Sequence, residues 1–598
     1  MKNDATFIGN VRRVVGATVY ATLSGDLPST SPIVNGRVYR IGQIGSFVRI
    51  PLGFLNAYGI VSMVGATVSR NDDEFYPRVI DAECTLEIRL VGEAYGASPF
   101  QRGLSVYPTV DDEVHVVTED DLGKIYAPSG SSSVCIGRHS ASESLAATLD
   151  LDKLLTRHAA ILGSTESGKS NTVAAILKAL TDGRFPKAQI IVIDPHGEYR
   201  SAFQGISRVF SIGDQEFPLV LPYWCSSFDE LAWFLVDRQR ATETVQDSAL
   251  REKVFEMRQK AAETVEVGTT QQRLTEGEVT VDSPLPFDLR QLWYDLDRLE
   301  RTTYSDSART IEALEAEGDS ATLKSAKFKP HGAGSALPVK PQPPPIMGTY
   351  TNKILQRLKD RRYDFLLQPD RYGGADLSEL LQSWLNHENP ITVFDLAGVP
   401  PDVIDLVVGV LSRILTEVAF WGRELADIGR HRPLLLVMEE AHRYLPSGEG
   451  YFIQGYARRS VQRILKEGRK YGLGAILVSQ RPSELDETIL SQCGTFVALR
   501  LSNAQDQSRV RSAIPDELGG LVDLLPALRT GEAIISGEAT QIPSRVRVHL
   551  VEPRPSSGDP DVARLWSDAA KCAPNYLQAV TNWRRQRITV EERNQSEL

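Results

Sequence analysis

The sequence predicts an α/β fold, in which a mostly parallel sheet follows a small β-barrel and is interrupted by a helical insertion. From Arg157 onward, strand-length apolar runs alternate with helical stretches, a pattern typical of a parallel sheet covered by helices on both faces. Before that point, short segments alternate polar and apolar residues between Gly, Pro and Asn turns, as half-buried antiparallel strands do. Charged, helix-prone sequence separates the second apolar run from the third.

Length and charge limit what the chain can be. Its 598 residues exceed one compact domain, and its 42% hydrophobic and 24% charged residues are ordinary for a globular protein. The 66 basic and 77 acidic residues give a net charge of -11, which excludes a surface that coats nucleic acid with all its faces. A nucleic-acid site would have to be local, such as the inside of a ring.

Cysteine usage and hydropathy predict a soluble cytoplasmic protein. The five cysteines form no C-x-x-C pair, which argues against a disulfide framework or a structural zinc site. The first ten residues lack the apolar core of a signal peptide. No apolar run approaches the roughly 18 residues that a membrane helix needs, so we expect no membrane partner.

Residues 1–145 are predicted to form the β-barrel and to serve as an assembly domain. Its expected strands include Arg37–Ile41, Phe47–Ile50, Gly59–Val64, Cys84–Val91 and Glu113–Val117.

Residues 146–200 and 386–550 are predicted to form the α/β core. Its expected strands are Ala159–Leu162, Gln189–Ile193, Ile391–Phe394, Leu434–Met438, Ala475–Ser479, Phe496–Leu499 and Ala533–Ile535. Residues 201–385 are the helical insertion, and its Pro- and Gly-rich tract, residues 329–345, is predicted to be a flexible connector. Residues 551–598 form a C-terminal appendage with two expected helices, Asp561–Lys571 and Pro574–Arg587.

A phosphate-binding motif follows the first core strand. Residues 163–170 match G-x-x-x-x-G-K-[ST], with an apolar strand before and an amphipathic helix after. Glycines let backbone N–H groups wrap around phosphate, the lysine reaches the β- and γ-phosphates, and the serine hydroxyl ligates Mg²⁺. The alternative is a Gly-rich turn that only joins strand to helix. We therefore predict a RecA-like P-loop NTPase core that takes ATP and Mg²⁺ through Gly163, Ser164, Thr165, Glu166, Ser167, Gly168, Lys169, Ser170 and Asn171.

Carboxylates stand at the tips of two other core strands. Glu439 and Glu440 follow a buried strand, where the first can meet the metal and the second can act as general base on the attacking water. The alternative is a pair of acidic residues that cap a helix. An acidic cluster that includes Asp194 and Glu198 follows the second strand and is predicted to act around the metal-bound water, unless the segment is simply a turn built from Asp-Pro and Gly.

Gln480 ends the strand after the hydrolytic one. An amide there can hydrogen-bond the γ-phosphate or the attacking water, although a lone polar strand end would be unremarkable without the other motifs.

Taken together, these motifs resemble the HerA branch of the HerA/FtsK group of P-loop motors. The matching segments are R-H-A-A-I-L-G-S-T-E-S-G-K-S, I-D-P-H-G-E-Y, L-V-M-E-E-A-H-R-Y, E-G-R-K-Y-G and V-S-Q-R-P, in family order. The resemblance implies a homohexameric ring that pumps double-stranded DNA through its centre. It also implies a partner effector, either a NurA-like nuclease or a sirtuin-like or other effector of antiphage defence. Glu439 departs from the Asp that many P-loop enzymes carry at that position.

The resemblance also makes Arg469 an arginine finger that acts on a neighbouring subunit's nucleotide, and Arg157 a second nucleotide-sensing arginine. Arg469 sits beside a basic helical stripe, for which a solvated face, a DNA contact and a subunit contact all stay open. Arg459, Arg463, Lys466 and Lys470 make up the stripe.

Two functions from different classes follow. The first is an ATP-driven double-stranded DNA translocase, with or without strand separation. The second is an ATP-gated ring scaffold that activates an effector with little translocation, against which stands the full hydrolytic set of Lys169, Glu440, Arg469 and Gln480. A secretion or conjugation coupling ATPase would normally carry membrane anchors, and none is visible in the sequence.

Overall fold

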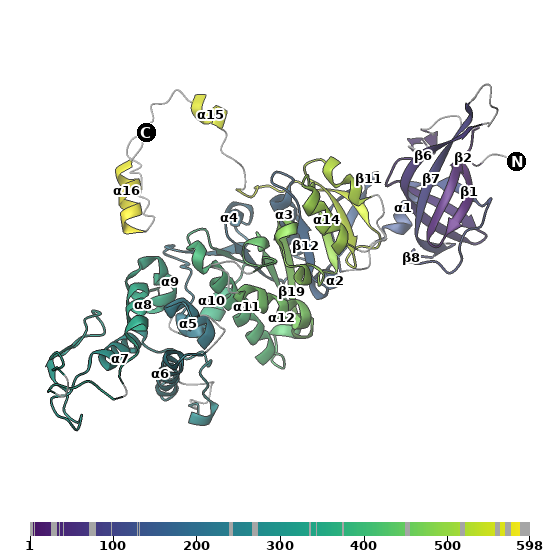
Figure 1. Cartoon of the computed structure of the whole chain (residues 1–598). Coiled ribbons are helices and arrows are strands. Elements are labelled where there is room, and N and C mark those ends of the chain that lie inside the picture. Colours follow the sequence, from purple (N-terminus) through teal and green to yellow (C-terminus); the bar gives the residue numbers. More distant parts are fainter. Residues whose placement is uncertain are drawn as a thin grey trace.

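The computed structural model describes residues 4–586 except 5, 26–30, 32, 35, 40, 71–78, 97, 128–129, 131, 141, 239–242, 266–272, 334–335, 343, 373–375, 449–454, 515–520, 557–561 and 568–575. The barrel, the core and the insertion follow one another along the long axis of the molecule (Figure 1). Within these residues, no helix combines the length and the apolar character that crossing a membrane would require.

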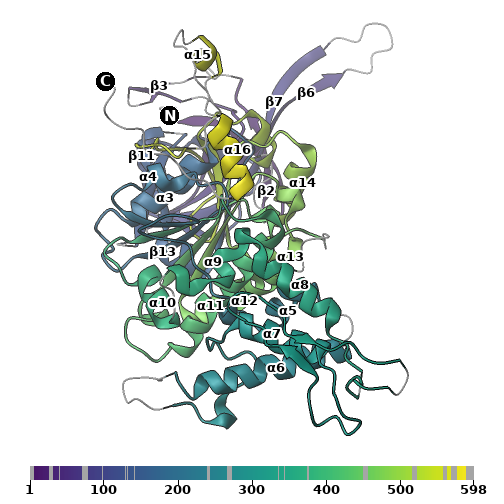
Figure 2. The same cartoon turned by 90° about the vertical axis from the view of Figure 1, so that its left-hand side faces the viewer.

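The N-terminal barrel is closed by the antiparallel pairing of its longest strand, residues 79–95, with its second strand, residues 18–23. Around the barrel run β1 (Phe7–Val15), β2 (Thr18–Leu23), β7 (Val79–Tyr95), β6 (Leu55–Arg70), β5 (Phe47–Leu52) and β9 (Glu113–Val116). The short β8 (Gln101–Arg102) adds to β7, while β3 (Ile33–Val34) and β4 (Arg37–Val38) pair with each other. The β6–β7 hairpin projects well beyond the barrel (Figure 2). The predicted barrel is thus confirmed.

The core is one sheet that contains every predicted core strand. Across the described sheet the order is β11 (Ser142–Asp150), β10 (Ser133–His139), β22 (Ser544–Val548), β21 (Glu532–Gly537), β20 (Thr495–Ala498), β12 (Ala159–Leu162), β19 (Leu473–Ser479), β18 (Leu434–Met438), β13 (Gln189–Asp194), β17 (Ile391–Asp395) and β14 (Ser207–Ser211).

The sheet is mixed rather than parallel throughout. From β20 to β14 the neighbouring strands are parallel, whereas β21, β22, β10 and β11 pair in antiparallel fashion. Strand β10 precedes residue 145 and β11 spans it, and the pairing of β10 with both β22 and β11 places these strands in the core sheet. Strand β14, from the start of the insertion, likewise joins the core through β17.

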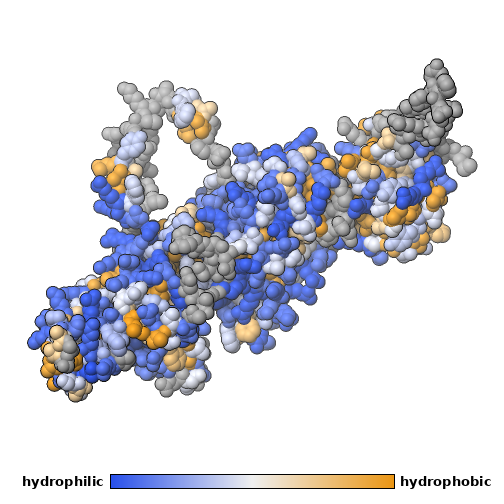
Figure 3. Space-filling model, in the orientation of Figure 1, coloured by the Kyte–Doolittle hydropathy of each residue, from blue (hydrophilic) through white to orange (hydrophobic). Residues whose placement is uncertain are grey.

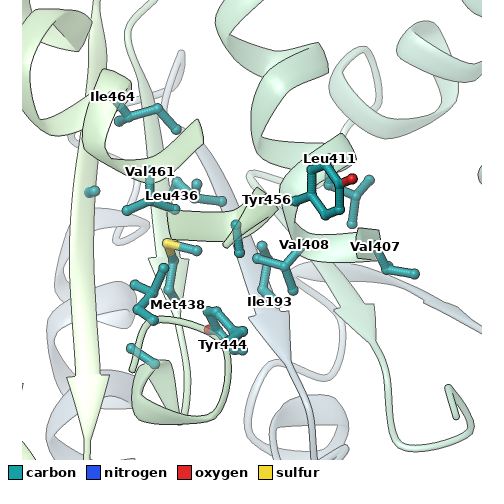
Figure 4. Packing of buried hydrophobic residues seen from close by; sticks show 14 of the residues in the cluster. Ile193, Val407, Val408, Leu411, Leu436, Met438, Tyr444, Tyr456, Val461 and Ile464 are labelled. Atoms are coloured by element: carbon teal, nitrogen blue, oxygen red, sulfur yellow. The ribbon is translucent and has the colours of Figure 1, made fainter. Parts of the chain in front are cut away.

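Strand alternation divides the core residues between two faces. One face packs against α3 (Lys169–Leu180), with α2 (Leu151–Thr156) and α4 (Tyr199–Ala202) beside it. The other face packs against α11 (Ile404–Trp421) and α12 (Tyr456–Tyr471), which meet β13 and β18 through a set of buried side chains (Figure 4). Farther along this face lie α10 (Leu377–Leu385), α13 (Glu487–Leu490) and α14 (Ala504–Ala513). Helix α1 (Glu119–Ile125) links barrel and core.

The insertion is a helical body that an ion pair joins to the core. Its helices are α5 (Phe228–Val236), α6 (Val245–Ala262), α7 (Leu289–Arg301), α8 (Gly348–Lys359) and α9 (Asp364–Leu367). It also contains a hairpin of β15 (Leu314–Ala316) and β16 (Lys327–Phe328). Arg413 of α11 donates to the buried Glu230 of α5 at 2.8 Å, which ties the insertion to the core. In the Pro-rich tract, Val339 pairs with Tyr304 and Lys329 N donates to Ala313 O.

Two short helices extend from the core at the C-terminus, α15 (Val562–Ser567) and α16 (Tyr576–Arg585). They fall within the two segments predicted to be helical, and the remainder of those segments lies outside the described residues apart from Gln586. Trp566 is 86% exposed and Trp583 is 75% exposed. Hydrophobic residues show on these helices and on the barrel, while the visible core face is mostly hydrophilic (Figure 3).

Candidate active site

The phosphate loop bends sharply between β12 and α3, and only glycine fits at its two glycine positions. Gly168 begins the helix with φ +96°, and a Cβ there would lie 2.9 Å from the backbone N of Gly531. A Cβ on Gly163 would lie 2.6 Å from Ser167 Oγ. Side chains at either position would push the loop away from its neighbours, so glycine keeps the loop backbone accessible to an anion.

Donors in the loop are available to such an anion. The Ser167 hydroxyl is fully buried and has no hydrogen-bond partner among the described residues. A buried hydroxyl without a partner is costly unless a ligand satisfies it. The N-terminus of α3 adds a favourable partial charge at the same point. Both features suit the phosphates of a nucleotide.

Lys169 lies between the two predicted hydrolytic carboxylates. Its Nζ donates to Glu440 Oε1 at 2.5 Å and to Glu439 Oε2 at 3.4 Å. Burial alone would lower the pKa of the Lys169 ammonium, but the two carboxylates outweigh burial and raise that pKa. Burial likewise favours a high pKa for Glu440, but the ammonium lowers it. Both groups are therefore charged near neutral pH.

These two carboxylates directly follow the buried strand β18. Its five residues are all buried, and the chain turns immediately after Met438. Glu440 adopts the left-handed conformation, with φ +48°, which is unusual for a residue with a side chain. Glu439 faces Lys169 with Oε2, and its Oε1 accepts a hydrogen bond from the Tyr199 hydroxyl. Burial raises the pKa of Glu439.

Gln480 joins the phosphate loop to the Glu440 carboxylate. Its Nε2 donates to Glu440 Oε1 at 2.6 Å, and its Oε1 accepts from Thr165 Oγ1 at 2.9 Å. Strand β19 pairs with both β12 and β18 in parallel register, so their three C-terminal ends meet at one edge. The amide thus links the loop with Glu440.

Asp194 organises the turn after β13. Its carboxylate accepts backbone N–H groups of His196, Gly197 and Tyr199 at 2.9–3.1 Å. Burial raises the pKa of Asp194 to about 7, although these hydrogen bonds act against that shift. The carboxylate nearest the Ser170 hydroxyl is that of Glu198, whose Oε2 accepts from Ser170 Oγ at 2.9 Å.

A hard cation suits the oxygen groups around Ser170. Among the described residues, no three His, Cys, Asp or Glu side chains converge as a complete metal site. Mg²⁺ commonly takes one or two carboxylates and fills its other positions with water and substrate phosphates. The pairing of the Ser170 hydroxyl with Glu198, next to the buried Glu439, fits that mode of binding.

Arg157 and Arg469 lie at the N-terminal ends of the core strands, whereas the phosphate loop lies at the C-terminal ends. Arg157 precedes β12 and pairs with Glu538 at 3.2 Å, while the loop follows the end of that strand. Six residues of extended chain span about 20 Å. Arg469 precedes β19 and lines a cavity of about 350 Å³ together with Leu155, Lys187 and Arg430. Neither guanidinium is placed at its own chain's loop.

Two other predicted groups make contacts within the chain. Both amide atoms of Asn171 bind the segment after β22, because Nδ2 donates to His549 O at 2.9 Å and Oδ1 accepts from Val551 N at 3.0 Å. In the basic stripe, Arg463 pairs with Glu417 at 2.5 Å and Arg459 lies over the Tyr456 ring. The stripe is thus partly neutralised within this chain.

Three side chains of the site did not emerge from the motifs. The hydroxyl of Tyr199 binds Glu439, that of Tyr444 donates to Glu439 O at 2.7 Å, and His442 Nδ1 lies 3.2 Å from Glu440 Oε2. All three stand within the motif segments in the sequence. Their contacts depend on how the turns after β13 and β18 face each other, which spacing alone does not reveal.

Comparison with known proteins gives consistent matches. Residues 134–415 match the family model described as helicase HerA, central domain. The DNA double-strand break repair helicase HerA of Pyrococcus furiosus is 25% identical over 494 residues, which cover 78% of each chain. The protein of the same name from Sulfolobus acidocaldarius is 28% identical over 418 residues, 69% of each chain. Among solved structures, VirB4 of Thermoanaerobacter pseudethanolicus aligns with a TM-score of 0.44 at 14% identity, over 71% of this chain and 98% of that one.

Proposed function

We propose that this P-loop ATPase, which resembles the HerA helicases, is a motor that moves along double-stranded DNA as a homohexameric ring. The names of the relatives supply the substrate class, since they are DNA double-strand break repair helicases. We infer the ring from the positions of Arg157 and Arg469. Both lie at the N-terminal ends of core strands, away from their own phosphate loop. Guanidinium groups placed there are too far from their own loop and could serve a nucleotide held by another subunit.

The chemistry assigns a role to each group at the loop. Glu440 is the general base that takes a proton from the attacking water, and its lowered pKa keeps it ionised for that task. Lys169 moves from the carboxylates to the β- and γ-phosphates of ATP. Gln480 contacts both Glu440 and Thr165, so it orients the water and reports the state of the γ-phosphate to the loop.

Mg²⁺ would be held by Ser170 and by the carboxylates beside it, Glu439 and Glu198, with Asp194 behind them. When bound, the ion supplies charge neutralisation at the phosphate oxygens. Asp194 contributes by holding the turn that carries Glu198 and Tyr199.

Arg469 is the arginine finger and Arg157 a second arginine that senses the nucleotide, both acting across a subunit interface. Such a residue stabilises the charge that develops on the transferring phosphoryl group. Hydrolysis then depends on assembly of the ring. No nuclease constellation accompanies the described site, so a partner effector, a nuclease or a defence enzyme in the cytoplasm, would act on what the ring delivers.

The first test is ATP turnover as a function of protein concentration, with and without linear double-stranded DNA, for the wild type and Arg469→Ala. We expect turnover that rises with assembly, is stimulated by DNA and is lost in the variant, which should still bind ATP. Slow turnover that DNA does not stimulate and that persists in Arg469→Ala would contradict the motor. It would favour an ATP-gated scaffold for an effector.

A further inference from the structure

A cleft of about 700 Å³ lies beside the phosphate loop, bounded by β10, β22 and the start of β21. Its floor is the sheet face opposite α3. Val546 and Val548 of β22 pack with the core residues on the α3 side, so the alternating Arg545 and Arg547 project from the other face.

The lining of this arginine cleft is rich in positive charge. Among the described residues, Arg545 is the one basic side chain of the cleft that forms an ion pair, with Glu532 at 2.7 Å, and Arg529 acts on the same carboxylate from farther away. In the described part of the chain, no ion pair reaches Arg138, Arg529 or Arg547. The charged lining residues are Arg138, Arg529, Arg545, Arg547, Glu143 and Glu532. This is a local excess of positive charge on a chain whose net charge is -11.

The pairing of β10 with β22 brings two of these cations together. Arg138 stands directly opposite Arg547 in the antiparallel ladder, and like charges in that position repel each other. Nearby, the buried Nε of Arg545 has no hydrogen-bond partner among the described residues. An anion between the strands would relieve the repulsion and could accept from the guanidinium groups.

One wall of the cleft is hydrogen-bonded to the phosphate loop. Arg529 begins the turn before β21, and the next two residues contact the loop directly. Thr530 Oγ1 donates to Glu166 O at 3.1 Å, and Gly531 N donates to Ser167 O at 2.9 Å. Gly531 O in turn accepts from Val548 N of β22 at 2.9 Å. A ligand that shifts this turn therefore acts on the loop.

We propose that the arginine cleft binds phosphodiester groups of the DNA backbone and conveys their presence to the phosphate loop through residues 529–531. The inference rests on the proposed function, which supplies DNA as the substrate. Guanidinium matches phosphate in shape and charge, and exposed arginines in an open cleft can follow a polymer. The phosphates of the nucleotide bind the N–H groups of the phosphate loop instead, so the cleft is left for a different phosphate.

The test uses the full-length protein with a non-hydrolysable ATP analogue and a fluorescein-labelled linear duplex. Anisotropy titrations at several salt concentrations compare the wild type with Arg138→Gln/Arg547→Gln. We expect the double variant to bind the duplex at least about 10-fold more weakly, with a salt slope smaller by about one for each DNA phosphate that is no longer neutralised. The matched control is Arg301→Gln/Arg362→Gln, which removes two exposed arginines of the insertion that already have acidic partners. It should bind like the wild type.

The outcomes separate this inference from the proposed function. If the wild type does not bind the duplex and its ATP turnover does not respond to the duplex, the proposed function itself is wrong. If the wild type binds the duplex and the double variant binds it with the same affinity and salt slope, only the proposal for the arginine cleft is wrong. Weaker binding of a fluorescent ATP analogue with unchanged duplex binding would assign the cleft to the nucleotide, and loss of the assembled ring by light scattering would assign it to a subunit contact. Either result overturns the DNA site.

Discussion

Lys169 is shared between two carboxylates and, during turnover, a phosphate. Its contacts with Glu440 and Glu439 must weaken when the γ-phosphate arrives, because one ammonium cannot serve all three at full strength. Glu440 then keeps Gln480 and His442 as neighbours. In the proposed mechanism, ATP binding thus releases Glu440 to act as the general base when the attacking water is in place.

Glu440→Gln should abolish turnover while preserving ATP binding. An amide cannot take the proton, and general base catalysis is worth about 10²- to 10⁴-fold in rate. The measurement is the initial rate of phosphate release, with a fluorescent ATP analogue to check binding. Glu484→Gln is the control, since this carboxylate lies nearby but pairs with Arg481. A Glu440→Gln rate above about a tenth of the wild type would remove Glu440 from the role of base.

Tyr199→Phe should lower kcat with little effect on ATP affinity. The substitution leaves the buried Glu439 Oε1 without its hydroxyl donor, at a cost of about 1–3 kcal/mol in unfolding free energy. Glu439 then loses its fixed orientation beside Ser170. Turnover and thermal unfolding are measured together.

Tyr350→Phe is the matched control for stability. It breaks a buried tyrosine–carboxylate bond of the insertion, to Asp247 Oδ1 at 2.7 Å, and should lower the Tm while ATP turnover stays intact. Equal loss of turnover in both variants would mean that Tyr199 acts only through overall stability.

Among the elements, the strand–loop–helix unit depends on close contact between the phosphate loop and the turn before β21. Gly168→Ala should prevent ATP binding, because the added Cβ meets Gly531 N at 2.9 Å and forces the loop away from that turn. Isothermal titration with an ATP analogue measures the loss.

Gly183→Ala controls for backbone strain. Gly183 has a similar φ of +91°, but a Cβ there would meet nothing within 4 Å. The strain of a positive φ should therefore lower the unfolding free energy of Gly183→Ala by about 1 kcal/mol or more. The variant should bind ATP normally. Normal ATP affinity in Gly168→Ala would show that the loop does not need this contact.

Local pattern was enough to predict the elements that carry the chemistry. The strand before the phosphate loop is predicted and observed as Ala159–Leu162, and the strand before Glu439 as Leu434–Met438, since a buried run with turn residues at its ends has few alternatives. The convergence of Lys169 with Glu440 follows from parallel pairing.

Contacts between distant segments could not be predicted in this way. The placement of β10 and β11 in the core sheet depends on pairing with β22, which no local period encodes. The arginine cleft is a product of that pairing. The bond between Tyr199 and Glu439 depends on side-chain direction in two turns, and sequence spacing does not determine it.

At the scale of the whole molecule, mixing subunits should restore activity that neither variant has alone. In a mixed ring, an Arg469→Ala subunit keeps an intact site and a Glu440→Gln neighbour supplies its arginine. We expect ATP turnover to reappear when the two inactive proteins are dissociated and reassembled together. Glu440→Gln mixed with Lys169→Ala is the control, because neither subunit then has a working site. Failure of the first mixture in rings shown to contain both subunits would contradict action across the interface.

The pairing of β10 with β22 also sets an order of events during synthesis. A chain leaving the ribosome can close its barrel early, because every barrel strand precedes residue 117. The core sheet must wait, since β10 and β11 emerge before the phosphate loop, whereas β22 follows every other described strand. Until β22 arrives, the edge of β10 is an unpaired template for other strands. A chain that stops before β22 would therefore present a finished barrel beside an open sheet, without the strand that holds Gly531 next to the phosphate loop.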